Sequence, residues 1–260
     1  MRRLLSISLL LALCSMMAFA WEYDSSAKTV EHSVQLRAGA EFTKKWQNGI
    51  HLSVEEDLRF DLYNSLSGTA FNKSYTTLTF SYSPVKEFKV DAGYTLKLLG
   101  NKDWDDYNEF LRHRVFMSVT GSYKVGRVKL SLRERAMCEI RTDSVNPLEK
   151  NQYNWMLRSK FGIEYTCFSK PLKPYMWVEV VNTLNAPEYQ QKNGHQYIRR
   201  VRTAVGTTWR LNKNNSLNFY YRFNYGYDRD INISKKNQKI ELTEEYGYQH
   251  AIGIAYEFGW

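Results

Sequence analysis

The sequence lacks most of the features that reveal a protein's class at once. After residue 20 it has no apolar run of about 20 residues, the length that a membrane-spanning helix needs, which excludes a helical membrane protein. Cys138 and Cys167 are too few for a disulfide framework, and we expect both to stay unpaired. The five histidines lack the spacing of metal ligands and no glycine-rich phosphate loop is present, so we expect neither a metal nor a cofactor.

The mean hydropathy of −0.54 is polar, but it does not exclude a membrane barrel, because only alternate residues of a barrel strand are apolar. The N-terminus predicts export: two arginines precede an apolar stretch over residues 4–13, and the small residues Ala18 and Ala20 form an Ala-x-Ala cleavage site. We therefore expect residues 1–20 to be a cleaved signal peptide and residues 21–260 to form a single domain.

Alternation of apolar and polar residues dominates the mature chain and predicts strands. In the segment 33–42, for example, every even position is apolar and every odd position is polar or glycine. Most segments are 10–14 residues long, about the length of a tilted membrane strand. The eleven segments are 33–42, 50–62, 75–82, 88–98, 114–123, 128–140, 155–165, 175–180, 200–211, 217–227 and 246–260.

The connections between these segments alternate in length. Short ones lie near 45–49, 83–87, 125–126, 169–172 and 212–215, and long ones near 63–72, 100–110, 141–152, 186–196 and 229–244. This pattern is typical of an outer-membrane barrel with short periplasmic turns and longer extracellular loops. A soluble sandwich also alternates, but its strands are usually about 5–6 residues long. The fold class predicted is all-β, a transmembrane antiparallel up-and-down β-barrel.

The number of strands depends on one polar segment. Bacterial single-chain barrels usually have an even number of strands, so a further strand must precede the segment at 33–42. Trp21–Val30 is the candidate, either as a short strand or as a thread through the lumen, although it is polar. We therefore expect about 12 strands, with 10 as the alternative.

The C-terminal segment resembles the insertion signal of outer-membrane barrels. Tyr256, Phe258 and Trp260 lie on one face of the last predicted strand, and Trp260 is the final residue. We expect this strand to contact the barrel-assembly machinery. The bilayer and lipopolysaccharide of the outer membrane are the other partners expected. No nucleic-acid partner is expected, because the tyrosines and the basic residues fall on opposite faces of the strands. The oligomeric state is left open.

Several short motifs resemble one family. Arg112–Arg114, Gly121–Lys124 and Lys129–Arg135 are similar to the middle of the domain of unknown function 2490, a set of predicted outer-membrane proteins. Ala92–Tyr94 and Phe219–Arg222, together with Pro174, Tyr175, Val178 and Glu179, resemble that family too. The resemblance implies an outer-membrane barrel but supplies no activity and no catalytic residues.

A formal net charge of +9 could mean contact with an anionic partner, but the alternation puts most of the charges on the strand face that would line a lumen. The predicted lumen cluster is Arg37, Arg59, Arg112, Arg114, Arg133, Arg135, Glu139, Arg158, Glu164, Glu179, Arg202 and Arg222. It could form a cation-lined path for an anionic solute or a salt-bridged plug. A two-residue turn at Val125-Gly126 would make Arg112 face Glu139.

The function predicted is non-enzymatic, either a structural barrel or a narrow channel for small solutes. The same turn would place His113 opposite Cys138 on the outward face, which also carries Glu134. A thiol–imidazole pair can make a nucleophile, so the alternative is a lipid-modifying hydrolase of the outer barrel wall. No Ser-His-Asn motif supports that alternative, and we expect no catalytic residues.

Overall fold

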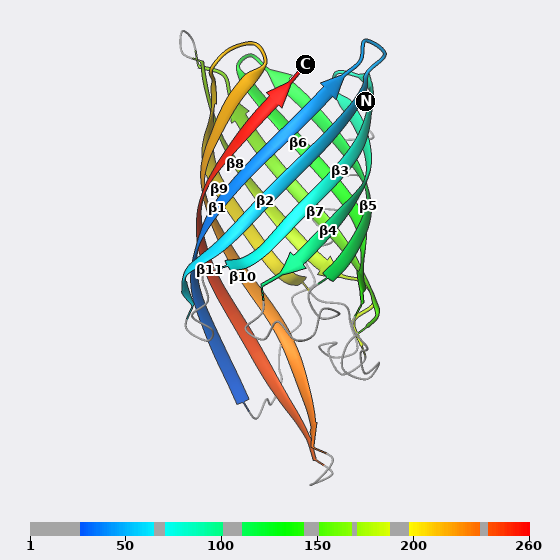
Figure 1. The fold of residues 1–260 in the computed structure, drawn as a ribbon, viewed down its shortest axis with the longest axis vertical. Coiled ribbons are helices and arrows are strands. Elements are labelled where there is room, and N and C mark those ends of the chain that lie inside the picture. Colours follow the sequence, from blue (N-terminus) through cyan, green and yellow to red (C-terminus); the bar gives the residue numbers. More distant parts are fainter. Residues whose placement is uncertain are drawn as a thin grey trace.

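A computed structural model describes residues 27–64, 71–100, 111–142, 151–167, 171–187, 198–234 and 239–260. These residues form a closed barrel, and none of the described segments is a helix long and apolar enough to cross a bilayer (Figure 1). The strands are β1 (Ala27–Lys45), β2 (Ile50–Asn64), β3 (Phe71–Val85), β4 (Phe88–Leu99), β5 (Leu111–Val125), β6 (Val128–Arg141), β7 (Tyr153–Tyr165), β8 (Leu172–Thr183), β9 (Ile198–Arg210), β10 (Asn215–Ser234) and β11 (Lys239–Gly259). The eleven predicted segments are therefore confirmed as strands.

The closure of the barrel corrects the predicted strand count. Every pair of strands that follow each other in the chain is antiparallel, but β1 and β11 pair in parallel, from Ala27 opposite Thr243 to Thr43 opposite Gly259. An odd number of up-and-down strands must close in this way. The expected 12 strands, and the alternative of 10, are wrong for the described barrel. Of the candidate segment Trp21–Val30, residues 21–26 lie outside the described residues, and residues 27–30 extend β1.

Short turns and long connections lie at opposite ends of the barrel. Gly49 and Gly126 take positive φ angles of 80° and 58° in two short turns at the upper end of Figure 1. Side chains are strained at such angles, so glycine suits these positions. The second turn consists of Gly126 and Arg127, with Val125 paired to Val128. The predicted turn at Val125-Gly126 is thus displaced by one residue.

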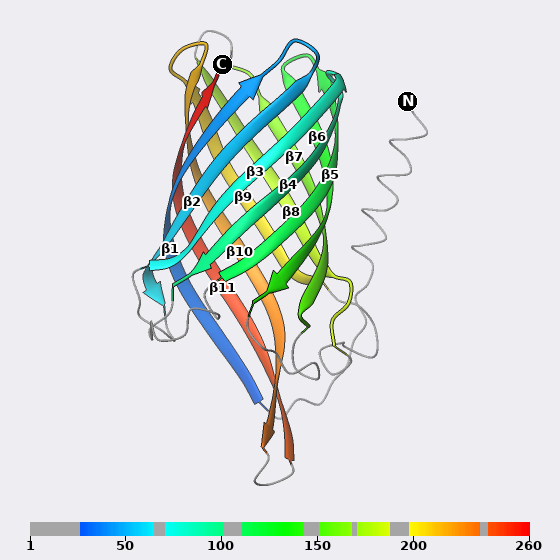
Figure 2. The same ribbon diagram turned by 45° about the vertical axis from the view of Figure 1, so that its right-hand side comes forward.

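A hairpin projects from the other end of the barrel. The last β10 residue paired to β9 is Gly226, but β10 and β11 continue to pair as far as Ser234 and Lys239. Figures 1 and 2 show this extension, with the start of β1 alongside β11. The loop predicted at 229–244 is therefore wrong, because most of it continues the two strands. The isoleucines at 231, 233 and 240 alternate with polar residues and were the sequence signal for this extension.

The two faces of the barrel wall differ sharply. Outward positions carry large apolar side chains with wide exposure, such as Met117 at 64% and Ile252 at 59%. Inward positions carry charges, amides and aromatic rings. Some rings lie directly over an inward glycine of the next strand: a Cβ added to Gly253 would come 2.1 Å from Tyr220 Cζ. Glycine permits this close approach because it has no side chain.

Candidate functional site

The barrel interior holds the residues predicted for a lumen cluster, each on an inward position of its strand. They are Arg37 on β1, Arg59 on β2, Arg112 and Arg114 on β5, Arg133, Arg135 and Glu139 on β6, Arg158 and Glu164 on β7, Glu179 on β8, Arg202 on β9 and Arg222 on β10. Most of them belong to one of three arrangements: two clusters centred on carboxylates, a network of amides, or contacts with aromatic rings. Arg59 and Glu164 form separate ion pairs.

The first carboxylate cluster surrounds Glu139. Arg114 is its partner across the β5–β6 pair, and Arg114 Nε donates to Glu139 Oε2 at 2.6 Å. Arg112, at the next inward position of β5, donates to Oε1 at 3.2 Å. Lys97 reaches Oε2 at 3.5 Å from β4. One buried carboxylate therefore binds three cations. We call these four residues the Glu139 cluster.

The second carboxylate cluster surrounds Glu179, which is only 1% exposed. Arg202 faces it across the β8–β9 pair, and Arg202 Nη1 lies 2.8 Å from Oε1. Arg158 Nη2 donates to both carboxylate oxygens at 2.8 Å, and Arg133 reaches Oε2 from β6 at 3.3 Å. This Glu179 cluster again combines three cations with one carboxylate.

The stoichiometry of these clusters has an energetic consequence. Burying a charge is costly unless it is paired, and breaking a buried pair costs more than the intact pair contributes. Three cations per carboxylate leave each cluster with net positive charge. Each glutamate is the only ion-pair acceptor for its cations among the described residues. The clusters thus depend on Glu139 and Glu179 more than on any one of the bases.

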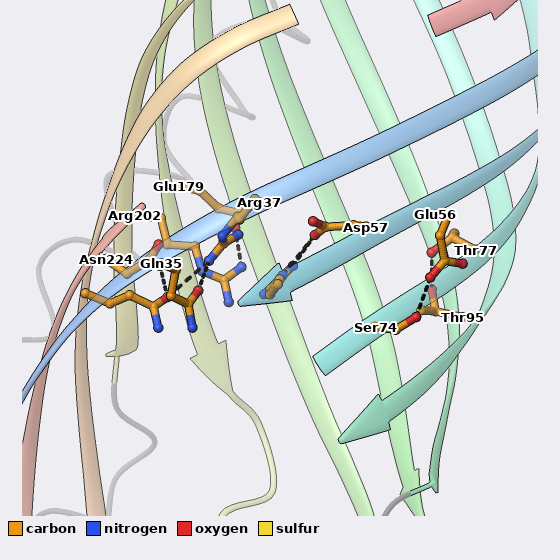
Figure 3. A network of polar contacts seen from close by, with 12 residues as sticks. Gln35, Arg37, Glu56, Asp57, Ser74, Thr77, Thr95, Glu179, Arg202 and Asn224 are labelled. Carbon is orange, nitrogen blue, oxygen red and sulfur yellow. Dashed lines mark hydrogen bonds and ion pairs between the residues drawn. The ribbon is translucent and has the colours of Figure 1, made fainter. Parts of the chain in front are cut away.

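A network of amides holds Arg37, which is also 1% exposed. Arg37 Nη2 donates to the Oε1 atoms of Gln35 at 3.0 Å and Gln249 at 3.1 Å (Figure 3). Gln35 in turn donates to Asp61 Oδ1 at 2.7 Å, and Asn224 donates to Gln249 Oε1 at 2.6 Å. The guanidinium is therefore fixed by neutral acceptors rather than by a carboxylate.

Other interior cations lie against aromatic rings. The guanidinium of Arg135 is 4.0 Å from the centroid of the Phe116 ring. Trp177 receives both Lys160, at 4.2 Å, and Arg222, at 5.1 Å. Within the described ranges, no carboxylate lies at ion-pair distance from these three cations. Cation–π contacts of this kind contribute about 0.5–2 kcal/mol and replace part of the lost hydration.

Two residues of the predicted lumen cluster, Arg59 and Glu164, form ion pairs outside the two carboxylate clusters. Arg59 makes two hydrogen bonds to Asp57 Oδ2 on its own strand, at 2.9 and 2.6 Å, and lies 4.0 Å from the Tyr75 ring. Glu164 pairs with Lys173 at 3.4 Å, where both side chains are about one-third exposed. Neither joins the two carboxylate clusters.

The inner face of the wall also carries apolar side chains. Phe116, Met137, Met156 and Val181 point inward from four neighbouring strands and form a buried apolar cluster, with exposures of 8% or less. They lie between the Glu139 cluster and the Glu179 cluster along their strands. Water therefore has little access to these four side chains.

Comparison with known proteins places this barrel in a family. The model of a family described as a protein of unknown function, DUF2490, matches residues 35–235. The chain belongs to the DUF2490 family. The resemblance inferred from the sequence is thus confirmed. No curated protein matches the sequence.

Two solved structures are similar to this DUF2490 barrel. A NanC porin in a rhombohedral crystal form has a TM-score of 0.46 and 11% identity, covering 73% of this chain and 86% of the porin. OmpT of Vibrio cholerae, expressed in the outer membrane, has a TM-score of 0.37 and 12% identity, covering 75% of this chain and 60% of OmpT.

The outer wall of the DUF2490 barrel does not assemble the predicted thiol–imidazole pair. His113 is paired with Ile140 across β5–β6, and Cys138 with Val115, because the turn is displaced by one residue. His113 Nδ1 instead contacts the Tyr94 hydroxyl. Because the turn is displaced by one residue, Arg112 is paired with Arg141 and not with Glu139. Its side chain still donates a hydrogen bond to Glu139, two residues along β6. The predicted opposition of His113 and Cys138 is therefore wrong.

Glu134, the third residue of the outward set, also has a structural partner. Its Oε2 accepts a hydrogen bond from Ser159 at 2.6 Å. A second outward carboxylate, Glu56, accepts one from Ser74 (Figure 3) and another from Thr76 at 2.6 Å. Strand register is unbroken at both glutamates, so neither marks a bulge. Each carboxylate is stabilised by hydroxyl donors on the next strand.

The predicted insertion residues line one side of β11. Phe258 stacks on Trp260, with ring centroids 5.3 Å apart, and Tyr256 packs edge-on against Phe42 of β1. Trp260 is hydrogen-bonded to β1 through backbone groups of Thr43 and Lys45. These aromatic side chains surround the β1–β11 closure at the short-turn end.

The projecting hairpin carries a polar cluster of its own. Glu244 accepts hydrogen bonds from the hydroxyls of Tyr227 and Tyr246, both at 2.9 Å, and from Arg229 at 3.3 Å. Burial alone would raise the pKa of the Glu244 carboxyl, but these donors lower it below its ordinary value. Burial and the same hydrogen bond raise the pKa of Tyr246 to about 12. The carboxylate is thus the stable form in this cluster.

The sequence reading missed several interior residues. Four residues that the sequence analysis did not name contact members of the predicted lumen cluster: Lys97, Tyr75, Trp177 and Phe116. The first three lie on the polar face of the alternation along their strands. That alternation was the available signal, because it places every second residue of a strand inside. Phe116 was assigned to no face because it interrupts a run of polar residues.

The two cysteines should differ in reactivity. Cys138 is 3% exposed, between Val115 and Trp155 on the neighbouring strands, whereas Cys167 follows β7 in a short connection and is partly exposed. The experiment uses the folded protein without the predicted signal peptide, that is, residues 21–260. A maleimide should label Cys167 rapidly and Cys138 only after denaturation. A Cys167→Ser variant is the control and should show no rapid labelling. Rapid labelling of that variant would contradict the burial of Cys138.

Proposed function

We propose that this DUF2490 protein is an integral outer-membrane β-barrel that is not an enzyme and whose lumen is closed at mid-height. The observation that carries the membrane part is the outward apolar face, which continues around the closed barrel. A soluble monomer rarely exposes an apolar patch beyond a few hundred Å². A bilayer removes that surface from water, and closure of the barrel leaves no unpaired strand edge in the hydrocarbon.

The closed lumen is supported by the burial of its central residues. Arg37 and Glu179 are each 1% exposed, and Phe116 is 4% exposed. An open channel would hydrate such side chains. The paired clusters and the apolar cluster therefore favour the salt-bridged plug over a path for solutes.

The proposed orientation follows the usual pattern of outer-membrane barrels. The short turns would face the periplasm, and the long connections and the projecting hairpin would face the exterior. The bilayer and lipopolysaccharide would then contact the outward apolar face. Tyr256, Phe258 and Trp260 would present the closing strand to the assembly machinery.

A nitroxide scan tests the membrane assignment. Residues 115–120 of β5 alternate between exposed and interior positions, with Met117 at 64% and Ser118 buried. We expect lipid-dissolved oxygen to relax labels at 115, 117 and 119 strongly and labels at 116, 118 and 120 weakly, in vesicles and with Cys138 and Cys167 replaced by serine. Strong relaxation by a water-soluble nickel reagent at 115, 117 and 119 would contradict a bilayer around this wall.

A further inference from the structure

A cavity of about 280 Å³ opens in the barrel between the Glu179 cluster and the short turns. Residues of five strands line it, from β6 to β10, and most of them are on inward positions. Drug-sized ligands occupy pockets of about 300–1,000 Å³, so this volume suits a smaller molecule. At its inner end the cavity borders the Glu179 cluster, because Lys160 is paired with Glu179 across β7–β8.

Two lysines make the cavity electropositive. Lys160 lies at its inner end, beside Arg133 on the next strand, and has no carboxylate at ion-pair distance within the described part of the chain. Lys129 is exposed at the outer end, two residues beyond the short turn. The carboxylate that lines the cavity, Glu164, is already paired with Lys173. An anion entering from the short-turn end would therefore meet uncompensated positive charge.

The walls between these lysines are suited to a ring. Trp177 and Tyr175 project from β8 into the lining, and the Tyr175 hydroxyl is held by a hydrogen bond of 2.8 Å to Asn218 Oδ1. Gly162, the partner of Trp177 across β7–β8, adds no side chain to the lining beside that ring. Thr208 adds a hydroxyl at the side of the cavity.

We propose that this cavity binds a small organic anion that carries a planar ring and a carboxylate or phosphate group. The anionic group would pair with Lys160 at the inner end, and the ring would lie against Tyr175, because the Trp177 ring already carries Lys160 and Arg222. This inference does not rest on the membrane assignment or on the closed lumen, because residues of β6 to β10 near the short turns form the cavity by themselves.

Calorimetric titration of the full folded chain in detergent tests the site, with benzoate, phenyl phosphate and the neutral benzamide as probes. We expect saturable binding of at least one anion in the millimolar range or tighter, and none of benzamide. Lys160→Gln should weaken anion binding at least about tenfold, since a hydrogen bond to a charged group contributes roughly that factor. Lys160→Arg, which keeps the charge, should bind within a few-fold of the parent protein.

Lys213→Gln is the matched control, because it removes one positive charge from an exposed turn at the same end of the barrel. It should leave binding unchanged. The proposal is overturned if neither anion binds at concentrations up to about 10 mM, if benzamide binds as well as benzoate, or if Lys160→Gln and Lys213→Gln behave alike.

Discussion

Glu179→Gln should lower the free energy of unfolding by about 3–5 kcal/mol, the usual cost of removing one partner from a buried ion pair. The glutamine keeps the shape of the side chain but leaves Arg133, Arg158 and Arg202 without their shared carboxylate. Three uncompensated guanidinium groups would then stay buried or force the wall apart. Urea unfolding of the refolded barrel, followed by tryptophan fluorescence, measures the loss.

Glu164→Gln is the control for this prediction. Glu164 also belongs to β7–β8 pairing and also binds a cation, but its pair with Lys173 is about one-third exposed. Exposed pairs contribute about 0–1 kcal/mol, so the control should unfold close to the parent protein. Equal losses in the two variants would contradict a special role for the Glu179 cluster.

Gly253→Ala should destabilise the barrel by about 1–3 kcal/mol, the usual cost of overpacking. The added Cβ would come 2.1 Å from Tyr220 Cζ and 2.4 Å from its hydroxyl oxygen. The ring can relieve the clash only by moving into the filled interior. The loss of stability can be measured by urea unfolding. It can also be measured from the temperature at which the folded barrel changes to the gel mobility of the unfolded chain.

Gly247→Ala is a closely matched control, on the same strand and on the same inward side. A Cβ at Gly247 would meet no atom within 4 Å, so its effect should stay within about 0.5 kcal/mol. A Gly253→Ala, Tyr220→Ala double variant should recover part of the loss, because the clashing ring is gone. An equal loss in both single alanine variants would show that the ring contact is not the cause.

The strands could be predicted because their pattern is local. In Phe88–Leu99, for example, the alternation shows that one face meets an apolar phase and the other does not. Closure could not be predicted in the same way, because nothing near residues 27–30 shows that they pair in parallel with Thr243–Tyr246. Because an even number of strands is expected, the sequence predicts a twelfth strand, whereas the described barrel has eleven.

The composition of the interior could also be predicted, but not its pairing. Alternation places Arg133 and Glu179 inside, yet these residues are 46 positions apart and meet across β7. Which cations meet depends on how far each strand is shifted along its neighbour. A turn displaced by one residue was enough to separate His113 from Cys138.

Ion conductance across a planar bilayer tests the closed lumen most directly. After the nitroxide pattern has verified insertion, we expect the parent protein to show no steady current above the baseline at moderate voltage. The reason is that, in the proposed closed lumen, the buried side chains of Arg37, Glu179 and Phe116 would leave no continuous path for ions. Stable, stepwise single-channel currents from the inserted parent protein would contradict the account and favour a cation-lined channel.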